Sequence, residues 1–436
     1  MKQKIIYRLW VSFFVLAGIL ACSEEPEANL PIEENDPIPE ENEPQLILTS
    51  SETTIYVSSA IQFKVMADEE PITDADIFID GVKISGYQYT FDKSGTKTVI
   101  ARKSGFIESA PLEITVKEKA VDVDIYVLGQ AASESRNQYQ PLYWKNGDWH
   151  PFQRENIGDF IFHAFTMGNG QLHVAGEKLY SSSRSTVFHW NDNIFDELSE
   201  SNSFASGKEI AVSGGDIYVG GIKKESSSVM AVGYWKNGNW NELSRGSVGN
   251  TDGGPIVIRD NDTYYAGVVN GSPKYWKNST EFSLEGETAA VTGMAVATNG
   301  DVYVAGYSYD IPNVALYWKN GERVILGKGE GNSNATDIFV DDNDVYVSGW
   351  EIVNLSTGGR SKSIARYWKN GESVDLTDGT IRAEANAIFV LDGEPYVVGE
   401  EYISPTTATL WVNGETTRLS HEEYNGSATD IYVVRK

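Results

Sequence analysis

Aromatic and acidic side chains gather at one recurring point of the sequence, just after a glycine that ends an apolar run. The candidates at this point are Trp350, Tyr307, Tyr309, Tyr402, Glu177, Glu400 and Glu401. Aromatic rings stack on sugar rings, and carboxylates accept hydrogen bonds from hydroxyl groups. This combination predicts a ligand-binding site with a glycan as the favoured ligand. An ordinary polar surface with scattered aromatics is the open alternative.

Other residue patterns offer no catalytic, cofactor or metal site. His173 and His189 occupy slots that hold tyrosine in most other repeats, which predicts packed positions on neighbouring strands rather than metal ligands. The run from Asp341 to Asp344 has calcium-like composition but lacks the glycine and glutamate of an EF-hand, so a solvated turn is favoured. No nucleophile elbow, phosphate loop or zinc motif is present. We therefore predict a non-catalytic protein without cofactors or metals.

Two markers recur seven times, which determines the predicted fold. The first is an apolar run ending in glycine, at Gly129, Gly176, Gly221, Gly267, Gly306, Gly349 and Gly399. The second is typified by Tyr143-Trp144-Lys145-Asn146-Gly147, and its tryptophans are Trp144, Trp190, Trp235, Trp276, Trp318, Trp368 and Trp411. Copies lie 39 to 50 residues apart, which suits one four-stranded blade per repeat. The prediction is an all-β protein whose residues 119–436 form a seven-bladed β-propeller.

The turn residues predict how the strands connect and how the ring closes. Asn-Gly after most of the repeat tryptophans predicts a tight hairpin between the third and fourth strands of each blade. The C-terminal run Ala428-Thr429-Asp430-Ile431 matches Ala335-Thr336-Asp337-Ile338, which predicts that the last strand completes the first blade. The ring is then closed by the C-terminal strand and leaves no free sheet edge.

The repeated Tyr-Trp pair is expected to pack between blades, because adjacent strand residues point to opposite faces and both faces are covered. Trp149, Phe195 and Trp240 share a further slot two residues past the hairpin, and we expect packing there too. Functional residues are instead expected on the face that carries the variable loops, near Trp350.

The N-terminal part predicts export and membrane attachment. Residues 1–21 have the basic start and short apolar run of a signal peptide, and Cys22, the sole cysteine, follows in a position suited to lipidation, although Leu20 is an imperfect lipobox residue. Residues 22–44 hold many carboxylates and prolines and no basic residue, which predicts a disordered acidic tether. Residues 45–118 show short alternating apolar runs and predict a small Ig-like β-sandwich that acts as a spacer.

The formal net charge of −27 excludes nucleic-acid binding as a main function, because the chain repels phosphates. The order of lipobox, acidic segment, Ig-like module and Tyr-Trp-Lys-Asn-Gly propeller resembles uncharacterised surface lipoproteins of Bacteroidota. The resemblance implies a monomer that is lipid-anchored in the outer membrane and faces the extracellular side. It implies no activity. A surface glycan-binding protein is the first hypothesis; a protein-interaction or assembly scaffold with a surface protein partner, and a carbohydrate-active enzyme, are the alternatives.

Overall fold

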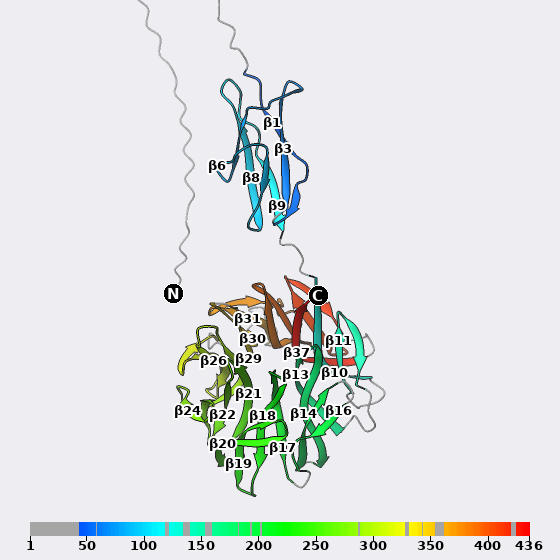
Figure 1. The fold of residues 1–436 in the computed structure, drawn as a ribbon, viewed down its shortest axis with the longest axis vertical. Helices are drawn as coiled ribbons and strands as arrows, with labels where there is room; N and C mark the ends of the chain where they lie inside the picture. Colours follow the sequence, from blue (N-terminus) through cyan, green and yellow to red (C-terminus); the bar gives the residue numbers. More distant parts are fainter. Residues whose placement is uncertain are drawn as a thin grey trace, which may run out of the picture. The chain divides into compact units, whose positions relative to one another are not determined.

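The computed structural model describes residues 43–57, 59–117, 122–133, 140–152, 159–181, 183–191, 194–200, 203–286, 288–327, 331–341, 343–353, 362–419 and 424–436. Every regular element within these ranges is a β-strand (Figure 1). Among the residues described, no helix has the length and hydrophobicity needed to cross a membrane. The chain divides into two compact units, Met1–Ala120 and Val121–Lys436. Cys22 and the acidic segment before residue 43 lie outside the described residues.

The first unit is a small β-sandwich. One sheet contains β1 (Ile47–Ser50), β3 (Ala60–Ala67), β4 (Glu70–Pro71) and β7 (Gln88–Thr90). The other has the order β2 (Thr54–Tyr56), β9 (Leu112–Lys117), β8 (Gly95–Arg102), β5 (Asp76–Ile79) and β6 (Val82–Lys83).

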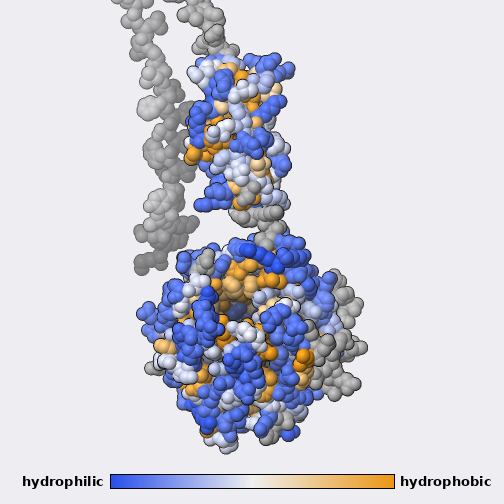
Figure 2. Space-filling model, in the orientation of Figure 1, coloured by the Kyte–Doolittle hydropathy of each residue, from blue (hydrophilic) through white to orange (hydrophobic). Residues whose placement is uncertain are grey.

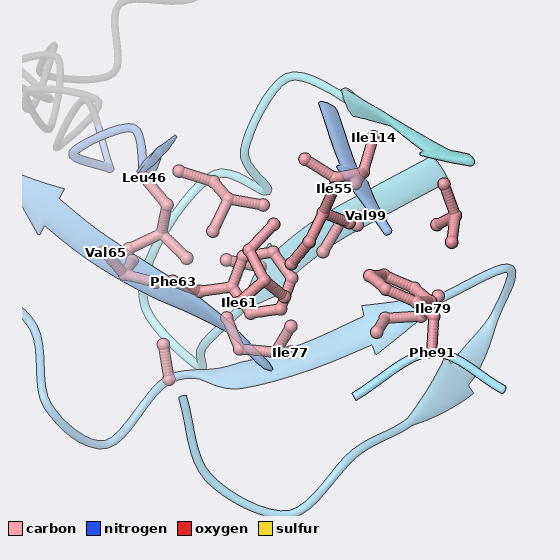
Figure 3. Close-up of a cluster of buried hydrophobic side chains, with 14 of the residues drawn as sticks. Leu46, Ile55, Ile61, Phe63, Val65, Ile77, Ile79, Phe91, Val99 and Ile114 are labelled. Atoms are coloured by element: carbon pink, nitrogen blue, oxygen red, sulfur yellow. The ribbon is translucent and has the colours of Figure 1, made fainter. Parts of the chain in front are cut away.

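The core of this unit follows from the two-residue period of a strand, which turns every second side chain inward. Along β3 the inward residues are Ile61, Phe63 and Val65, and all three are buried. Figure 3 shows them beside Ile77 and Val99 of the second sheet, in one continuous apolar cluster. The two sheets therefore share a single core.

The second unit is a β-propeller built from four-stranded antiparallel sheets, seven of which lie in the described part of the chain. The first strands of these sheets are β37 (Tyr424–Arg435), β13 (Phe160–Gly168), β17 (Ala205–Ser213), β21 (Asp252–Arg259), β25 (Ala289–Val296), β29 (Ser333–Asp341) and β33 (Ala383–Leu391). The second strands, in the same order, are β10 (Val123–Ser133), β14 (Gln171–Ser181), β18 (Asp216–Lys224), β22 (Asp262–Val269), β26 (Val302–Ser308), β30 (Asp344–Val353) and β34 (Glu394–Glu401).

The third and fourth strands complete each sheet toward its outer edge. The third strands are β11 (Gln140–Lys145), β15 (Arg184–Asn191), β19 (Val229–Lys236), β23 (Ser272–Lys277), β27 (Val314–Lys319), β31 (Lys362–Lys369) and β35 (Thr407–Val412). The fourth strands are β12 (Asp148–Pro151), β16 (Ile194–Glu197), β20 (Asn239–Ser247), β24 (Thr280–Ser283), β28 (Glu322–Ile325), β32 (Glu372–Asp375) and β36 (Glu415–Arg418).

The first strands lie innermost. Each contacts the first strand of the next sheet, from β13 through β17, β21, β25, β29 and β33 to β37, and β37 contacts β13 in turn. At the seam, β37 pairs antiparallel with β10 from Val123–Arg435 to Ser133–Tyr424. The last strand of the chain therefore joins the first sheet of the unit, as the matching Ala-Thr-Asp-Ile runs predict.

The repeated Lys-Asn pair holds the hairpin between the third and fourth strands. Asn320, at a φ of +52°, accepts the Val302 N–H with its Oδ1 at 2.8 Å and donates from its Nδ2 to Asp301 at 2.8 Å. Lys319 binds the other oxygen of Asp301 at 3.0 Å and lies over the ring of Tyr303. The same arrangement recurs around Asp124, Asp216, Asp262 and Asp344. The Lys-Asn pair of the repeat therefore stabilises the fold of each sheet.

The repeat tryptophans fill the space between sheets, as predicted. Trp144, Trp235, Trp276, Trp318 and Trp368 are almost fully buried, and Trp411 is buried as well. Trp318, for example, packs in a cluster with Tyr264 and Tyr275 of the neighbouring sheet. Because the same slot is apolar in sheet after sheet, the ring gains a continuous packing interface.

Each inner strand carries a β-bulge at the same point of its register. Side chains at the bulge bond to the next inner strand: the hydroxyl of Thr336 donates to the Ala385 carbonyl at 2.9 Å, and the Asn386 amide donates to the Ala428 carbonyl at 2.8 Å. A bulge re-aims side chains that strict alternation would place elsewhere. These bonds join neighbouring sheets around the centre of the unit.

Candidate functional site

Four of the candidate residues occupy one level of the propeller. Glu177, Tyr307, Trp350 and Glu400 each follow the glycine of a second strand, and each lies directly opposite a residue of the inner strand. We call this level the rim layer; its cross-strand pairs are Gln130–Ser427, Glu177–Ile161, Ile222–Ser206, Val268–Asp252, Tyr307–Ala290, Trp350–Asn334 and Glu400–Glu384. The candidates belong to strand ends rather than to loops. The second unit is hollowed toward its centre in Figure 2.

The most connected group of the rim layer lies on the sheet of β33 and β34. The Tyr402 hydroxyl donates to Glu400 at 2.6 Å and also lies 3.3 Å from Glu384. Arg382 binds Glu384 at 2.7 Å and places its guanidinium 4.1 Å from the centroid of the Tyr402 ring. Burial, together with the neighbouring carboxylates, raises the pKa of Tyr402, so the phenol stays protonated and acts as a donor.

Glu401, the next residue along β34, has a different environment. It is buried, and its Oε2 accepts a hydrogen bond from Nε of Arg418 on β36 at 2.9 Å. Glu351 of β30 holds the corresponding position and forms an ion pair with Arg366, which also binds Asp375 at 2.8 Å. We assign both carboxylates to ion pairs within their own sheets.

The aromatic candidates lie on the two preceding sheets. Tyr307 and Tyr309 form an edge-to-face pair with centroids 5.5 Å apart. Tyr309 keeps 54% of its surface exposed, whereas Tyr307 is half-buried and burial raises its pKa. Trp350 is also half-buried, between Asn334 of β29 and Ala365 of β31. Tyr307 and Trp350 thus offer partly exposed apolar faces at the level that Glu384 and Glu400 occupy on the following sheet.

Glu177 lies almost buried on β14, with 8% of its surface exposed. Burial alone would raise the pKa of its carboxyl, but the hydrogen bond from His163 and the charges of His163 and Lys208 outweigh it, and the pKa is lowered. His163 Nε2 lies 3.2 Å from Glu177 Oε1. Lys208 itself lies 3.9 Å from Asp252, so charged groups follow one another along this side of the ring.

Below the rim layer, three inner strands carry a carboxylate directly after the bulge: Glu209, Asp337 and Asp430. Asp337 accepts the N–H of Ile338 at 2.7 Å and that of Ile388 on the next inner strand at 3.0 Å. Burial raises the pKa of Asp337 to about 6 and that of Asp430 to about 8, and burial also raises the pKa of Glu209. Burial and mutual repulsion therefore favour the protonated, neutral form of these carboxyl groups, most strongly at Glu209 and Asp430.

The sequence interpretation missed several members of this site. Glu384, Arg382, His163, Lys208 and Asp252 lie on or before inner strands and follow no repeated pattern that marks them. The Thr-Asp-Ile runs around Asp337 and Asp430 did carry a signal, because an aspartate inside an otherwise apolar strand needs partners. The Thr-Asp-Ile runs indicated an inner strand. The β-bulge that gives the aspartates their partners cannot be recognised from a single sequence.

The histidine prediction is confirmed in its geometry. His173 and His189 are buried on β14 and β15, with Nδ1 and Nε2 3.0 Å apart and rings stacked. Burial, then the charge of His173, lowers the pKa of His189 to about 4. Among the residues that the structure describes, no group of three or more His, Cys, Asp or Glu side chains is arranged to hold a metal ion.

The acidic run with calcium-like composition is used in turns. Asp341 accepts the Gly393 N–H at 2.9 Å, and Asp344 binds Lys369 at 2.8 Å and Asn370 at 2.8 Å. Asp342 lies outside the described residues. The described carboxylates of this run therefore already have protein partners.

The residues two positions past the hairpin, Trp149, Phe195 and Trp240, lie opposite the repeat tryptophans, as expected. Trp240 lies directly opposite Trp235, with ring centroids 4.4 Å apart, and Phe195 packs against Phe160 and Phe188. Trp240 also borders a cavity of 560 Å³ between the sheets of β16 and β20. Lys223 lies 5.5 Å above its ring, so this indole face already has a cationic neighbour.

No protein-family model and no curated protein matches this chain. Among solved structures, the chain is similar to a puromycin-hydrolysing peptidase of Mycobacterium tuberculosis, with 12% identity and a TM-score of 0.40 over 78% of this chain and 56% of that chain. It is also similar to a periplasmic gluconolactonase of Pseudomonas aeruginosa, with 10% identity and a TM-score of 0.40 over 72% and 99% of the two chains.

A third similar structure is an auxiliary nutrient-binding protein of Bacteroides thetaiotaomicron, with 8% identity and a TM-score of 0.32 over 70% of this chain and 94% of that chain. The named neighbours include a peptidase, a lactonase and a binding protein. At such identities the likeness concerns the fold.

Proposed function

We propose that this protein is a non-catalytic binding protein that recognises a glycan at the rim layer of a closed seven-bladed propeller. The observation that carries the proposal is the group formed by Glu384, Glu400, Tyr402 and Arg382, with the half-buried rings of Trp350 and Tyr307 at the same level of the two preceding sheets. Carboxylates accept hydrogen bonds from hydroxyl groups and a guanidinium donates them to hydroxyl oxygens, while the rings cover the apolar face of a sugar.

The architecture suits this role. We take the seven sheets as blades, closed by the pairing of β37 with β10, and the first unit as an Ig-like module that acts as a spacer. With Cys22 as the lipidation site and an acidic tether before the module, the propeller works at the outer membrane on the extracellular side. Such a chain needs no cofactor, metal or second copy for this task.

The test is binding by the purified full chain to a glycan array, followed by calorimetry on the glycans that are retained. We expect the double variant Trp350→Ala, Tyr307→Ala to lose at least tenfold in affinity, because stacking on each ring contributes about 1 kcal/mol. Phe282→Ala is the matched control, since Phe282 is an exposed aromatic on the outer strand β24. An array without any bound glycan, or an unchanged affinity in the double variant, refutes the proposal.

A carbohydrate-active enzyme is the second candidate, favoured by the spacing of Glu384 and Glu400. Both carboxyl groups lie against one phenol oxygen, at 3.3 and 2.6 Å, so their nearest oxygens lie within about 6 Å of each other. Paired catalytic carboxyl groups of glycosidases are about 5–9.5 Å apart. Incubating the bound glycan with the protein distinguishes the two functions: new reducing ends that disappear in Glu384→Gln and Glu400→Gln indicate an enzyme, and an intact glycan indicates a binding protein.

A further inference from the structure

The rim layer contains buried polar atoms that have no hydrogen-bond partner among the described residues. They are Oε2 of Glu177, Oδ1 of Asn334 and Oγ of Ser206. The Ser185 hydroxyl also interacts with the Glu177 carboxylate and helps to lower its pKa, but its one hydrogen is donated to the Ala205 carbonyl at 2.7 Å. Buried polar atoms are almost always paired, since leaving one unpaired costs about 1–3 kcal/mol. Three such atoms at one level of the ring therefore point to a ligand that binds there.

The unpaired atoms indicate what the ligand must supply. A carboxylate oxygen and an amide oxygen only accept hydrogen bonds, and a serine hydroxyl accepts as well as donates. A molecule rich in O–H or N–H groups satisfies all three atoms. A carboxylate or sulfate group on the ligand would satisfy only the serine and would bring a fourth acceptor against the other two.

Charge at the rim layer favours the same kind of ligand. Its carboxylates are Glu177, Asp252, Glu384 and Glu400, and the basic side chains that contact them are Lys208, Arg382 and His163, so carboxylates outnumber basic groups by four to three. Lys208 and Arg382 each face a carboxylate of this group, at 3.9 and 2.7 Å. Neither cation is therefore available as a free anion-binding group.

Deeper in the ring, burial favours the protonated, neutral form of Glu209 and Asp430, so the negative field comes chiefly from the carboxylates of the rim layer. The pKa of Glu209 and that of Asp430 are raised first by burial and then by the charges of the neighbouring acids. A concave site lined by one sign of charge concentrates the field and attracts ligands of opposite charge. The chain as a whole carries a formal charge of −27, which strengthens the effect.

From the unpaired acceptors and the charge of the rim layer, we propose that the ligand is a neutral or amine-bearing sugar, and that glycans with uronate or sulfate groups are excluded. This inference rests on the proposed glycan-binding function and specifies its ligand class. Glu177 then acts as an acceptor for a ligand hydroxyl or ammonium group through its Oε2.

The experiment is a glycan array that contains glucose, glucosamine and glucuronate members in the same linkages, together with sulfated glycans, probed with the purified full chain. We expect neutral or amine-bearing members to bind at least tenfold more tightly than their uronate or sulfated counterparts. Glycans with uronate or sulfate groups that bind within threefold of their neutral counterparts overturn this inference and leave the proposed function standing. An array without bound glycans refutes the proposed function itself.

A pair of variants tests the role of Glu177 directly. Glu177→Gln removes one charge and one acceptor at constant shape, and we expect the affinity for the best array ligand to fall at least tenfold. Glu372→Gln is the matched control, because Glu372 is exposed on the outer strand β32. Tryptophan fluorescence of both variants confirms that they fold. An unchanged affinity of the folded Glu177→Gln variant overturns the assignment.

Discussion

The stacked pair of His173 and His189 should make the propeller sensitive to acid. In four other sheets the same slots hold two tyrosines, such as Tyr218 and Tyr234 with ring centroids 6.1 Å apart. Tyrosine, unlike histidine, has no basic ring nitrogen that takes up a proton in acid. His189 is buried, which lowers its pKa from 6.5 to about 4. Between pH 6.5 and pH 4, His189 therefore stays neutral in the folded chain but takes up a proton in the unfolded chain.

The sign and size of the effect follow from linkage. Above pH 6.5 His189 is neutral in both states and adds nothing. As the pH falls below 6.5 the unfolded chain takes up the proton, and the folded chain does so only near pH 4. Each unit of pKa shift corresponds to about 1.4 kcal/mol, so the loss of stability is about 2 kcal/mol at pH 5 and about 3.4 kcal/mol well below pH 4.

The assay is urea unfolding followed by tryptophan fluorescence, which reports on the second unit because every tryptophan except Trp10 lies there. The double variant His173→Tyr, His189→Tyr restores the tyrosine pair of the other sheets. Between pH 7 and pH 5 it should lose about 2 kcal/mol less than the natural chain. His150→Asn is the control, a histidine replaced outside the buried pair. Equal losses in the natural chain and the double variant would refute the reasoning.

Three further predictions concern other contacts of the propeller. Asn320→Ala should lower stability by about 1–2 kcal/mol, because alanine disfavours a positive φ and cannot accept the Val302 N–H. Asn320→Gly should recover the share of this loss that comes from the positive φ, and urea midpoints of the two variants measure the difference. Glu351→Leu should cost about 3 kcal/mol, since it deprives the buried Arg366 of a partner, and adding Arg366→Met should return most of that stability in the same assay. The pKa of Asp430 is about 8 in the folded chain, above the ordinary value of 3.8, so the contribution of Asp430 to stability is complete below about pH 4 and is lost as the pH rises to 8. In Asp430→Asn the urea midpoint should therefore change less between pH 5 and pH 9 than in the natural chain.

The features of the fold that repeat could be predicted from the sequence because each repeat obeys the same packing rules. The positive φ values at Asn146, Asn237 and Asn320 confirm the hairpins that Asn-Gly predicts. The pairing of β37 with β10 confirms the role of the last strand, which follows from the match of the run that begins at Ala428 to the run that begins at Ala335. Periodicity thus gave the strand order without any knowledge of long-range contacts.

The site was only half predictable, for a physical reason. Residues just after the strand glycine, such as Trp350 and Glu400, could be aligned from repeat to repeat, and they do share one level of the ring. Their partners on the inner strands, such as Glu384, could not be aligned, because variable connections precede those strands and the bulges shift the register by one residue. Cross-strand pairs depend on register, and a single sequence does not give it.

The rim layer differs from the packing slots in how its residues vary around the ring. A packing requirement acts alike on every sheet, and the slot of Trp318 is accordingly tryptophan in all seven repeats. The second-strand positions of the rim layer instead read Gln130, Glu177, Ile222, Val268, Tyr307, Trp350 and Glu400 in ring order. The polar and aromatic residues form one uninterrupted arc, from Tyr307 through Trp350 and Glu400 to Glu177, and only Ile222 and Val268 lie outside it. Because no common packing rule selects these residues, their grouping on one side fits a ligand that lies against that arc and reaches Ser206 on the sheet next to that of Glu177.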